Sequence, residues 1–359
     1  MLAIAGFSLS AFGLESKPSP DLKNQPVQVI AAGDSRFNYD GRFDFSKPGE
    51  PVVIWEGSRI SIDFEGTSLA LRFGEARGQN FFNVVIDDVL VEVMGIPAAE
   101  NQRIELKSKL AEGRHCLTLF KRSEADVGDV RFAGVDIAAD AQAWKPPMRA
   151  YKLRMECFGD SVMVGACNED GATDQWENRA THNNALSYTA LTAEAFHADY
   201  RCIAVSGMGI ATGYVEVKAG EIWNRLYPKK DSPLANLKTW QPDVALINFG
   251  ENDQSFPQTQ NLPFPKNYTA GYLALLKAMR AAYPKTHFVL LRGGMEGGAK
   301  NPQLRKAWEA VVKEVEATDA AISHFVFNHW STTHPRASDD RIMADELIAW
   351  LKQQSFMAK

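Results

Sequence analysis

Residues 156–165 read Glu-Cys-Phe-Gly-Asp-Ser-Val-Met-Val-Gly, and this stretch decides how the rest of the chain is interpreted. It completes an alternating run, Leu153 to Phe158, that has the length and pattern of a β-strand. The run breaks sharply at Gly159-Asp160-Ser161. A serine directly after a strand, on a glycine-containing turn, is held at the carboxyl edge of a sheet, where open α/β folds bind ligands. The triplet alone is a weak signal, because most such triplets are ordinary turns.

Three downstream segments occupy comparable positions. They are Ser206-Gly-Met-Gly-Ile210 after a strand-like run, Gly250-Glu-Asn-Asp253 after another, and Thr333-His-Pro335 before the last helical run. In a parallel sheet covered by helices, all four segments reach the same edge. Each segment also fits an ordinary turn, loop or helix start. Their joint order and placement favour one shared site.

The periodicity of the second half of the chain supports this topology. Largely apolar strand-length runs alternate with amphipathic helical runs, which is typical of a doubly wound parallel sheet with both faces covered. The predicted strands are 151–158, 200–205, 243–249, 287–292 and 322–327, and the predicted helices are 184–197, 268–282, 302–316 and 339–354.

The first half predicts a different architecture. Between about Val27 and about Asp136, turn residues separate short strand-like runs with no helical run between them, which is typical of a jelly-roll β-sandwich. Two consecutive prolines in Ala143-Trp-Lys-Pro-Pro-Met148 end the pattern, because proline continues neither a ladder nor a helix interior. We therefore predict a sandwich domain over 22–145 and an α/β domain over 150–357. The sandwich strands are expected at 52–55, 59–64, 68–73, 80–86, 103–106, 114–120 and 130–137.

Residues 1–21 are excluded from both domains. Met1 to Gly13 is apolar and rich in small residues, like the apolar part of a secretory signal, and Ser16-Lys-Pro-Ser-Pro20 reads as a linker. The positively charged leader of such a signal is missing, so a weakly helical or disordered tail is the alternative. We predict a secreted or periplasmic protein.

Composition excludes several classes of function. The 359 residues carry a formal net charge of -5 without a basic stripe, which argues against nucleic acid as a partner. The sequence contains no run of eighteen or more apolar residues, so it predicts no membrane-spanning helix. No histidine, cysteine and acidic set has metal-ligand spacing and no glycine motif fits a phosphate, so we predict no metal, nucleotide or other cofactor. The four cysteines form no CxxC pair; Cys157 and Cys202 are expected to be buried free thiols, although export would permit a disulfide.

The four segments together resemble the SGNH hydrolases, which are named for their Ser, Gly, Asn and His residues. The resemblance spans the second domain and implies a flavodoxin-like parallel sheet. In the first domain, Tyr39-Asp-Gly-Arg-Phe-Asp-Phe45, Ile54-Trp-Glu-Gly-Ser-Arg-Ile60 and Lys121-Arg-Ser-Glu124 are similar to the N-terminal sandwich of carbohydrate esterase family 2, and these motifs are less specific. That family joins a jelly roll to an SGNH domain and removes acetyl groups from plant polysaccharides and sugars, with a bias toward the 6-position of hexoses.

The resemblance implies a role for each residue. Ser161 is the nucleophile, and His334 is the base that takes its proton and returns it to the departing sugar. The backbone N–H groups of Ser161 and Gly207 and the side-chain amide of Asn252 form the oxyanion hole, with Gly209 as the competing choice for Gly207.

One position departs from the SGNH pattern. Many of these enzymes carry an aspartate three residues before the catalytic histidine, and here that residue is Ser331. Members of carbohydrate esterase family 2 are known for a Ser–His dyad in which a backbone carbonyl holds the imidazole. Our hypothesis is therefore a main-chain carbonyl near 330–332. An aspartate such as Asp339 or Asp340 is disfavoured, because both fall at the start of the last helix.

Further residues are candidates for support or for substrate binding. Asp160 is expected to fix the turn beside the nucleophile and is a candidate substrate contact, and Asp253 is expected to brace the Asn252 loop. Trp176, in the polar loop 170–184, and Trp330 are candidate sugar platforms, because indole and pyranose rings both present broad apolar faces. Ordinary packing is the alternative for both tryptophans.

The sequence thus predicts an esterase that deacetylates an acetylated carbohydrate. Two alternatives remain: a non-catalytic carbohydrate-binding protein, and a lipase or thioesterase of the SGNH superfamily. The polar loop 170–184 does not suggest the apolar acyl tunnel of a lipase. The sugar, the hydroxyl position and the oligomeric state are left open.

Overall fold

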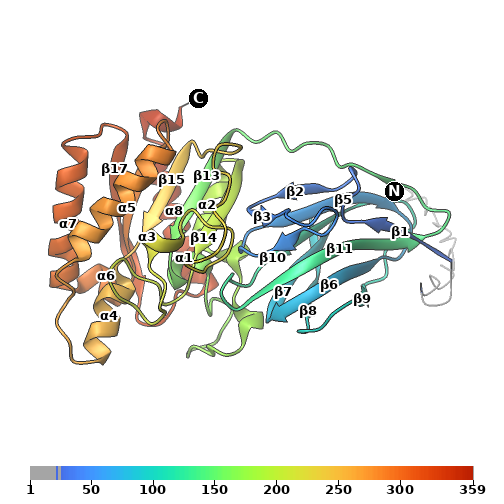
Figure 1. The fold of residues 1–359 in the computed structure, drawn as a ribbon, viewed down its shortest axis with the longest axis horizontal. Helices are drawn as coiled ribbons and strands as arrows, with labels where there is room; N and C mark the ends of the chain where they lie inside the picture. Colours follow the sequence, from blue (N-terminus) through green and yellow to red (C-terminus); the bar gives the residue numbers. More distant parts are fainter. Residues whose placement is uncertain (1–21, 23–25, 359) are drawn as a thin grey trace, which may run out of the picture.

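The structure is a computed structural model that describes residue 22 and residues 26–358. The predicted signal and linker, 1–21, lie outside the described residues. Figure 1 shows a β-sandwich beside an α/β body, with helices α5 (Tyr268–Ala282) and α7 (Pro302–Glu316) on the side far from the sandwich. The predicted fold class, a jelly-roll-type sandwich followed by a parallel α/β domain, is confirmed.

The sandwich consists of two six-stranded antiparallel sheets. On β5 (Arg59–Glu65), Ile60, Ile62 and Phe64 alternate with polar residues and pack in the apolar core between the sheets, because successive side chains of a strand point to opposite faces. The first sheet holds β1 (Val27–Ala31), β3 (Phe43–Asp44), β4 (Val52–Val53), β6 (Ala70–Gly78), β9 (Gln102–Glu105) and β11 (Gly128–Ala138). The second holds β2 (Asn38–Asp40), β5 (Arg59–Glu65), β7 (Asn80–Ile86), β8 (Val89–Ile96), β10 (Arg114–Lys121) and β12 (Ala143–Trp144).

The α/β body is built on five parallel strands in the order β14-β13-β15-β16-β17. Their bounds are β13 (Leu153–Gly159), β14 (Ala198–Ala204), β15 (Val244–Asn248), β16 (His287–Met295) and β17 (Ile322–Ser331). Both faces are apolar: Ala245 and Ile247 of β15 enter one core and Val244 and Leu246 the other. Such strands need helices on both sides.

Helices α3 (Ala219–Ile222), α5 (Tyr268–Ala282) and α7 (Pro302–Glu316) contribute buried residues to one of these cores, and α1 (Ser161–Val164), α2 (Tyr188–Ala195) and α8 (Ala337–Leu351) to the other. The remaining helices are α4 (Glu251–Thr259), α6 (Glu296–Lys300), η2 (Arg179–Thr181), η3 (Asn184–Leu186) and η4 (Ser355–Met357). Among the described residues, none of the helices has the length and apolar character needed to cross a membrane.

Two differences from the predicted elements have clear local causes. The expected helix at 184–197 splits into η3 and α2, because Ser187 is extended and its side chain accepts a hydrogen bond from Ala190 N, capping a new helix. Strand β8 was not predicted. Asp87 and Asp88 both adopt positive φ (52° and 63°), which is the geometry of a tight hairpin turn, and β8 pairs back on β7.

A buried ion pair joins the two bodies. Arg42 of the sandwich donates to Glu156 Oε1 on β13 at 2.9 Å and to the Trp223 carbonyl at 2.8 Å. Tyr283 donates to the other oxygen of Glu156 at 2.7 Å. The side chains of Arg42 and Glu156 are 3% and 0% exposed, so each charge depends on its partners for solvation.

We expect Arg42→Met to lower the free energy of unfolding by about 3–5 kcal/mol, because it leaves Glu156 charged and buried without its cation. Urea unfolding followed by tryptophan fluorescence measures the loss. Arg36→Met is the control: Arg36 pairs with Asp34 at the surface, where the side chains are 35% and 29% exposed, and its loss is expected to cost less than about 1 kcal/mol. Equal losses for the two variants would contradict a buried pair.

Candidate active site

The Gly159-Asp160-Ser161 turn lies at the end of β13. Ser161 is the first residue of α1 and is 4% exposed. Asp160 caps this helix, with Oδ1 accepting from Val162 N at 3.1 Å. Burial raises the pKa of Asp160 to about 8. The contacts are those of the turn-fixing role expected for Asp160, and its contact with substrate stays a prediction.

The glycine segment is shaped by its lack of side chains. Gly207 has φ +79°, a left-handed conformation that glycine adopts without steric cost. At Gly209 an added Cβ would lie 1.9 Å from the Thr212 carbonyl oxygen. Both glycines are therefore required by the backbone, and the choice between them as oxyanion donor stays a prediction.

Two side chains of the Asn252 segment tie the turns together. Asn252 Nδ2 donates to Asp160 Oδ2 and to the Met208 carbonyl, both at 3.0 Å. The Asp253 carboxylate accepts from the backbone N–H groups of Ile210 at 2.8 Å and its two successors at 2.7 and 3.0 Å. Asp253 therefore braces the backbone of 210–212 in the glycine segment, whereas the sequence predicted that it braces its own Asn252 loop, and the serine, glycine and asparagine segments form one hydrogen-bonded unit.

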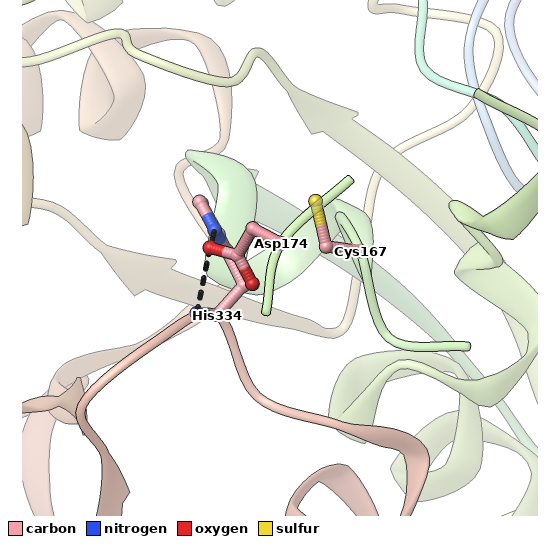
Figure 2. A group of neighbouring side chains, drawn as sticks. All are labelled: Cys167, Asp174 and His334. Carbon is pink, nitrogen blue, oxygen red and sulfur yellow. Dashed lines mark hydrogen bonds and ion pairs between the residues drawn. The ribbon is translucent and has the colours of Figure 1, made fainter. Parts of the chain in front are cut away.

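His334 has a carboxylate partner. Its Nδ1 lies 2.7 Å from Asp174 Oδ2, and Figure 2 shows the two side chains facing each other. Arg336 binds the other oxygen of Asp174 at 2.8 Å. Burial acts to raise the pKa of Asp174, but the hydrogen bond from His334 and the ion pair with Arg336 outweigh it and hold that pKa well below its ordinary value. The ionised carboxylate fixes the proton on Nδ1 and leaves Nε2 free to accept one.

The hypothesis of a main-chain carbonyl on His334 is therefore wrong. Ser331 Oγ donates to the Thr333 carbonyl and so shapes the turn before the histidine. Asp339 and Asp340 were rightly disfavoured: Asp339 binds His329 at 2.7 Å, and Asp340 accepts from Tyr188 N at 3.0 Å. The orienting aspartate comes from the loop that follows α1, 160 positions before the histidine.

Sequence reasoning missed Asp174 because no local spacing connects it with His334. The polar loop 170–184 was singled out for Trp176, and its acidic residues were the available signal. Their connection to His334 depends on tertiary contacts: Arg336 donates to the carbonyls of Gly171 at 2.7 Å and Cys167 at 3.1 Å, which holds the loop against the His334 segment.

The two candidate sugar platforms lie in different surroundings. The Trp176 ring is stacked on His334, with centroids 5.4 Å apart and planes at 30°. Trp330, on β17, has the Lys300 ammonium 3.6 Å from its ring centroid. Trp176 therefore lies beside the His334 imidazole, whereas one face of the Trp330 ring is already covered by Lys300. Sugar stacking stays a prediction for both.

Cys167, Asp174 and His334 bring potential metal-ligand atoms within 4.8 Å of one another. Each atom group already has a partner: Asp174 binds His334 and Arg336, and Cys167 Sγ lies 3.5 Å from His182 Nε2. A guanidinium on the same carboxylate opposes a second cation by charge repulsion. The arrangement suits proton transfer better than metal binding.

Burial raises the pKa of Glu251, the neighbour of Asn252, against the hydrogen bonds that its carboxylate accepts from Gly298 N and the Gln254 side chain. A buried serine on a tight turn, an oriented imidazole and an amide beside a glycine turn are the parts needed for nucleophilic acyl transfer.

Comparisons with known proteins agree with this chemistry. Residues 39–147 match the family model described as carbohydrate esterase 2 N-terminal, and residues 157–347, more than half of the chain, match that of the GDSL-like lipase/acylhydrolase family. Cellulase/esterase CelE of Acetivibrio thermocellus is 29% identical over 328 residues, covering 88% of this chain and 39% of that protein.

Acetylxylan esterase / glucomannan deacetylase of Cellvibrio japonicus is 29% identical over 329 residues, covering 86% of this chain and 87% of that protein. Among solved structures, a family two carbohydrate esterase from Clostridium thermocellum in complex with cellohexaose superposes with a TM-score of 0.79 at 27% identity, covering 88% of this chain and 98% of the other.

Proposed function

Because the chain belongs to the GDSL-like lipase/acylhydrolase family and carries a carbohydrate esterase 2 N-terminal domain, we propose that it is a serine esterase that removes O-acetyl groups from carbohydrate. The substrate class is a plant polysaccharide or oligosaccharide, including 6-O-acetyl hexoses. The observation that carries the proposal is the Asp174–His334 pair, which prepares an imidazole to accept a proton at Nε2. A polysaccharide substrate requires export, so the proposed location is secreted or periplasmic.

The mechanism assigns one step to each group. Ser161 Oγ attacks the acetyl carbonyl carbon while His334 Nε2 takes the hydroxyl proton, and Asp174 stabilises the imidazolium that forms. Collapse of the tetrahedral intermediate breaks the bond to the sugar oxygen, which receives the proton from Nε2. Water then attacks the acetyl-serine with the same base, releasing acetate and restoring Ser161.

Negative charge develops on the former carbonyl oxygen during both attacks. The proposed donors are the N–H groups of Ser161 and Gly207 and the amide of Asn252. Both hydrogens of Asn252 Nδ2 are engaged in this structure, one by Asp160 and one by the Met208 carbonyl. An oxyanion is a stronger acceptor than a neutral carbonyl, so it takes over the hydrogen that Met208 now accepts.

Asn252→Ala is expected to reduce kcat by about 10²–10³-fold with little change in KM, because the lost donor acts mainly on the transition state. Steady-state kinetics on 4-nitrophenyl acetate measure the effects on kcat and on KM separately. Asn261→Ala, at an exposed position in the loop after α4, is the control and should leave both constants unchanged. A purely KM effect in Asn252→Ala would argue against an oxyanion donor.

The proposed function is tested by acetate release and covalent labelling together. Acetylated glucomannan and acetylated xylan are incubated with the protein, and free acetate is quantified. Diethyl 4-nitrophenyl phosphate should then inactivate the enzyme stoichiometrically, with the diethylphosphoryl mass on the peptide that contains Ser161. Binding of either polymer without acetate release or labelling would replace the esterase by a carbohydrate-binding protein.

A further inference from the structure

The edge of the parallel sheet is completed by the sandwich. Strand β14 is the edge strand, and Val205 N donates toward β13, so the N–H groups of Ala204 and Ser206 point away from the sheet. Buried N–H groups need acceptors. Glu56 Oε1 accepts from Ala204 N at 3.1 Å, and Glu124 Oε2 accepts from Ser206 N at 3.2 Å. Both carboxylates come from the sandwich.

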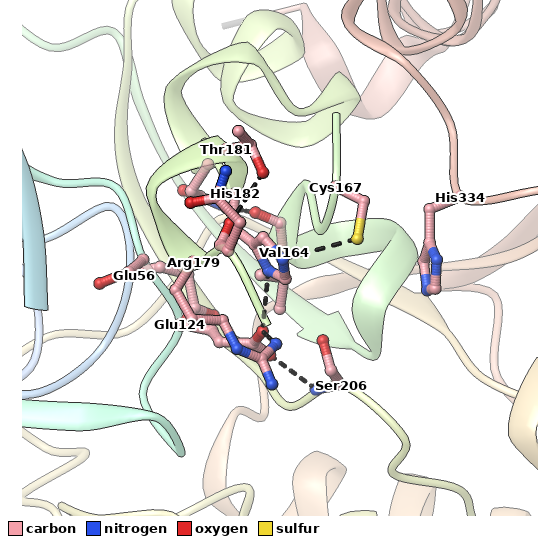
Figure 3. Close-up of polar contacts among 12 residues, drawn as sticks. Glu56, Glu124, Val164, Cys167, Arg179, Thr181, His182, Ser206 and His334 are labelled. Carbon is pink, nitrogen blue, oxygen red and sulfur yellow. Dashed lines mark hydrogen bonds and ion pairs between the residues drawn. The ribbon is translucent and has the colours of Figure 1, made fainter. Parts of the chain in front are cut away.

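The second oxygen of Glu124 reaches the other side of the site. Its Oε1 accepts from Arg179 at 3.1 Å and from His182 Nδ1 at 3.2 Å, and Figure 3 shows Glu124 between these residues and Ser206. Because His182 donates from Nδ1, its Nε2 is left to accept from the Cys167 thiol.

Arg179 and His182 flank the indole of Trp176. The guanidinium carbon of Arg179 lies 4.3 Å from the ring centroid of Trp176, and the His182 ring lies edge-on at 5.4 Å. Trp176 in turn stacks on His334. One carboxylate therefore touches the backbone next to Gly207 and supports the packing around the base.

The turn that carries Glu124 is fixed in place. The Lys121 ammonium is fully buried and donates to the carbonyls of Ser123 at 3.1 Å and Glu124 at 3.3 Å. Ala125 N donates to Glu56 Oε2 at 3.1 Å. A turn held on both sides of residue 124 allows little movement of the carboxylate.

The charge of Glu124 is matched to its donors. Burial acts to raise the pKa of Glu124, but His182, Ser206 and Arg179 outweigh it and bring that pKa to about 2. The group is therefore an anion at neutral pH, able to accept hydrogen bonds on both oxygens.

We propose that Glu124 is a positioning residue, through which the sandwich sets the relative placement of the oxyanion turn and of the indole that packs on the catalytic base. The expected effect of Glu124 on the reaction rate rests on the proposed esterase function. Its expected effect on the order of the two loops rests on the hydrogen bonds alone. The inference gives the sandwich a part in catalysis in addition to any contact with carbohydrate.

Glu124→Gln tests the inference with minimal change of volume. Three donors converge on the carboxylate, but glutamine has one acceptor oxygen, so its amide N–H₂ must face either Ser206 N or Arg179. Misplacement of a site by about 1 Å costs up to about 10²-fold in rate, and we expect kcat per active site to fall about 10–100-fold with KM nearly unchanged. Titration with the organophosphate counts the active sites.

Asp44→Asn is the matched control. Asp44 is a buried sandwich carboxylate that accepts from Tyr227 of the α/β body at 2.7 Å, at a contact outside the two loops bound by Glu124. Its kcat per titrated site is expected to equal that of the wild type. If the kcat of Glu124→Gln equals that of the wild type once it is divided by the number of titrated sites, the inference is overturned. The loss of activity would then come only from a smaller fraction of folded protein.

Hydrogen exchange decides the structural part without any substrate. In Glu124→Gln, peptides covering 205–212 and 174–183 should exchange faster than in the wild type, while peptides from β15 and β16 stay protected; Asp44→Asn should show neither increase. Unchanged exchange in both loops would overturn the inference. If the wild type releases no acetate, the proposed function fails, and the exchange result alone supports or rejects the positioning role.

Discussion

Ser161→Ala is expected to reduce acetate release by about 10⁴–10⁶-fold, because it removes the oxygen that attacks in the proposed mechanism and leaves only the binding and oxyanion contributions. The substitution removes one buried oxygen atom at the start of α1 and leaves the Asp160 cap intact, so the urea midpoint should stay within error of the wild type. Acetate release from acetylated glucomannan and hydrolysis of 4-nitrophenyl acetate give the two rates.

Ser331→Ala is the comparison for this variant. Ser331 lies three residues before His334, and its hydroxyl bonds the Thr333 carbonyl, so its loss should cost less than about tenfold in kcat, the effect of one neutral hydrogen bond. If Ser161→Ala retained more than a tenth of the wild-type rate, the nucleophile would have to be another residue.

Asp174→Asn is expected to lower kcat by about 10³–10⁴-fold, with KM nearly unchanged. When the asparagine turns its N–H₂ group toward Nδ1 of His334, it favours the imidazole tautomer that carries its proton on Nε2. In that tautomer Nε2 cannot accept a proton from Ser161. The neutral amide also removes the charge that stabilises the imidazolium. The rate should rise again at high pH, because hydroxide can substitute for the lost base; pH–rate profiles of both proteins measure this.

Glu177→Gln supplies the control, since Glu177 lies exposed in the same loop and the substitution removes one negative charge, as Asp174→Asn does. It should behave as the wild type at every pH. An Asp174→Asn enzyme with at least half of the wild-type kcat would restore the dyad hypothesis and reduce the 2.7 Å contact to a structural one.

The parts of this molecule that could be predicted from sequence are those specified by local pattern. Helices α5 and α7 were predicted with the bounds that the structure shows, because each is a long amphipathic run. Helix α4 was missed, since Pro257 lies inside it and Gly250-Glu-Asn-Asp253 reads as a loop. Strands β3 and β12 are two residues long, too short to show a periodic pattern, and each exists through its pairing, β3 with the next strand β4 and β12 with the distant strand β5.

The residues of the candidate site also fall into those that local sequence marks and those that depend on distant contacts. Ser161, Gly207, Asn252 and His334 each stand beside a strand or helix end that the sequence marks. Asp174 and Glu124 act across 160 and 82 positions, on His334 and Ser206 respectively, and no periodicity reports a contact of that kind. Lys121-Arg-Ser-Glu124 contributed to the family resemblance, but its role appears only when the sandwich is packed on β14.

The packing of the sandwich on β14 also decides whether the two domains can be separated. Trp55 and Ile54 of the sandwich belong to the same apolar cluster as Phe158 and Ile203 of the parallel sheet, so one hydrophobic core is shared between two domain types. A catalytic half excised at the diproline would carry a bare strand edge, two orphaned amides and an uncovered apolar surface, which together invite aggregation. In protein engineering, the unit of this protein that can be transferred to another chain is therefore the tandem of both domains.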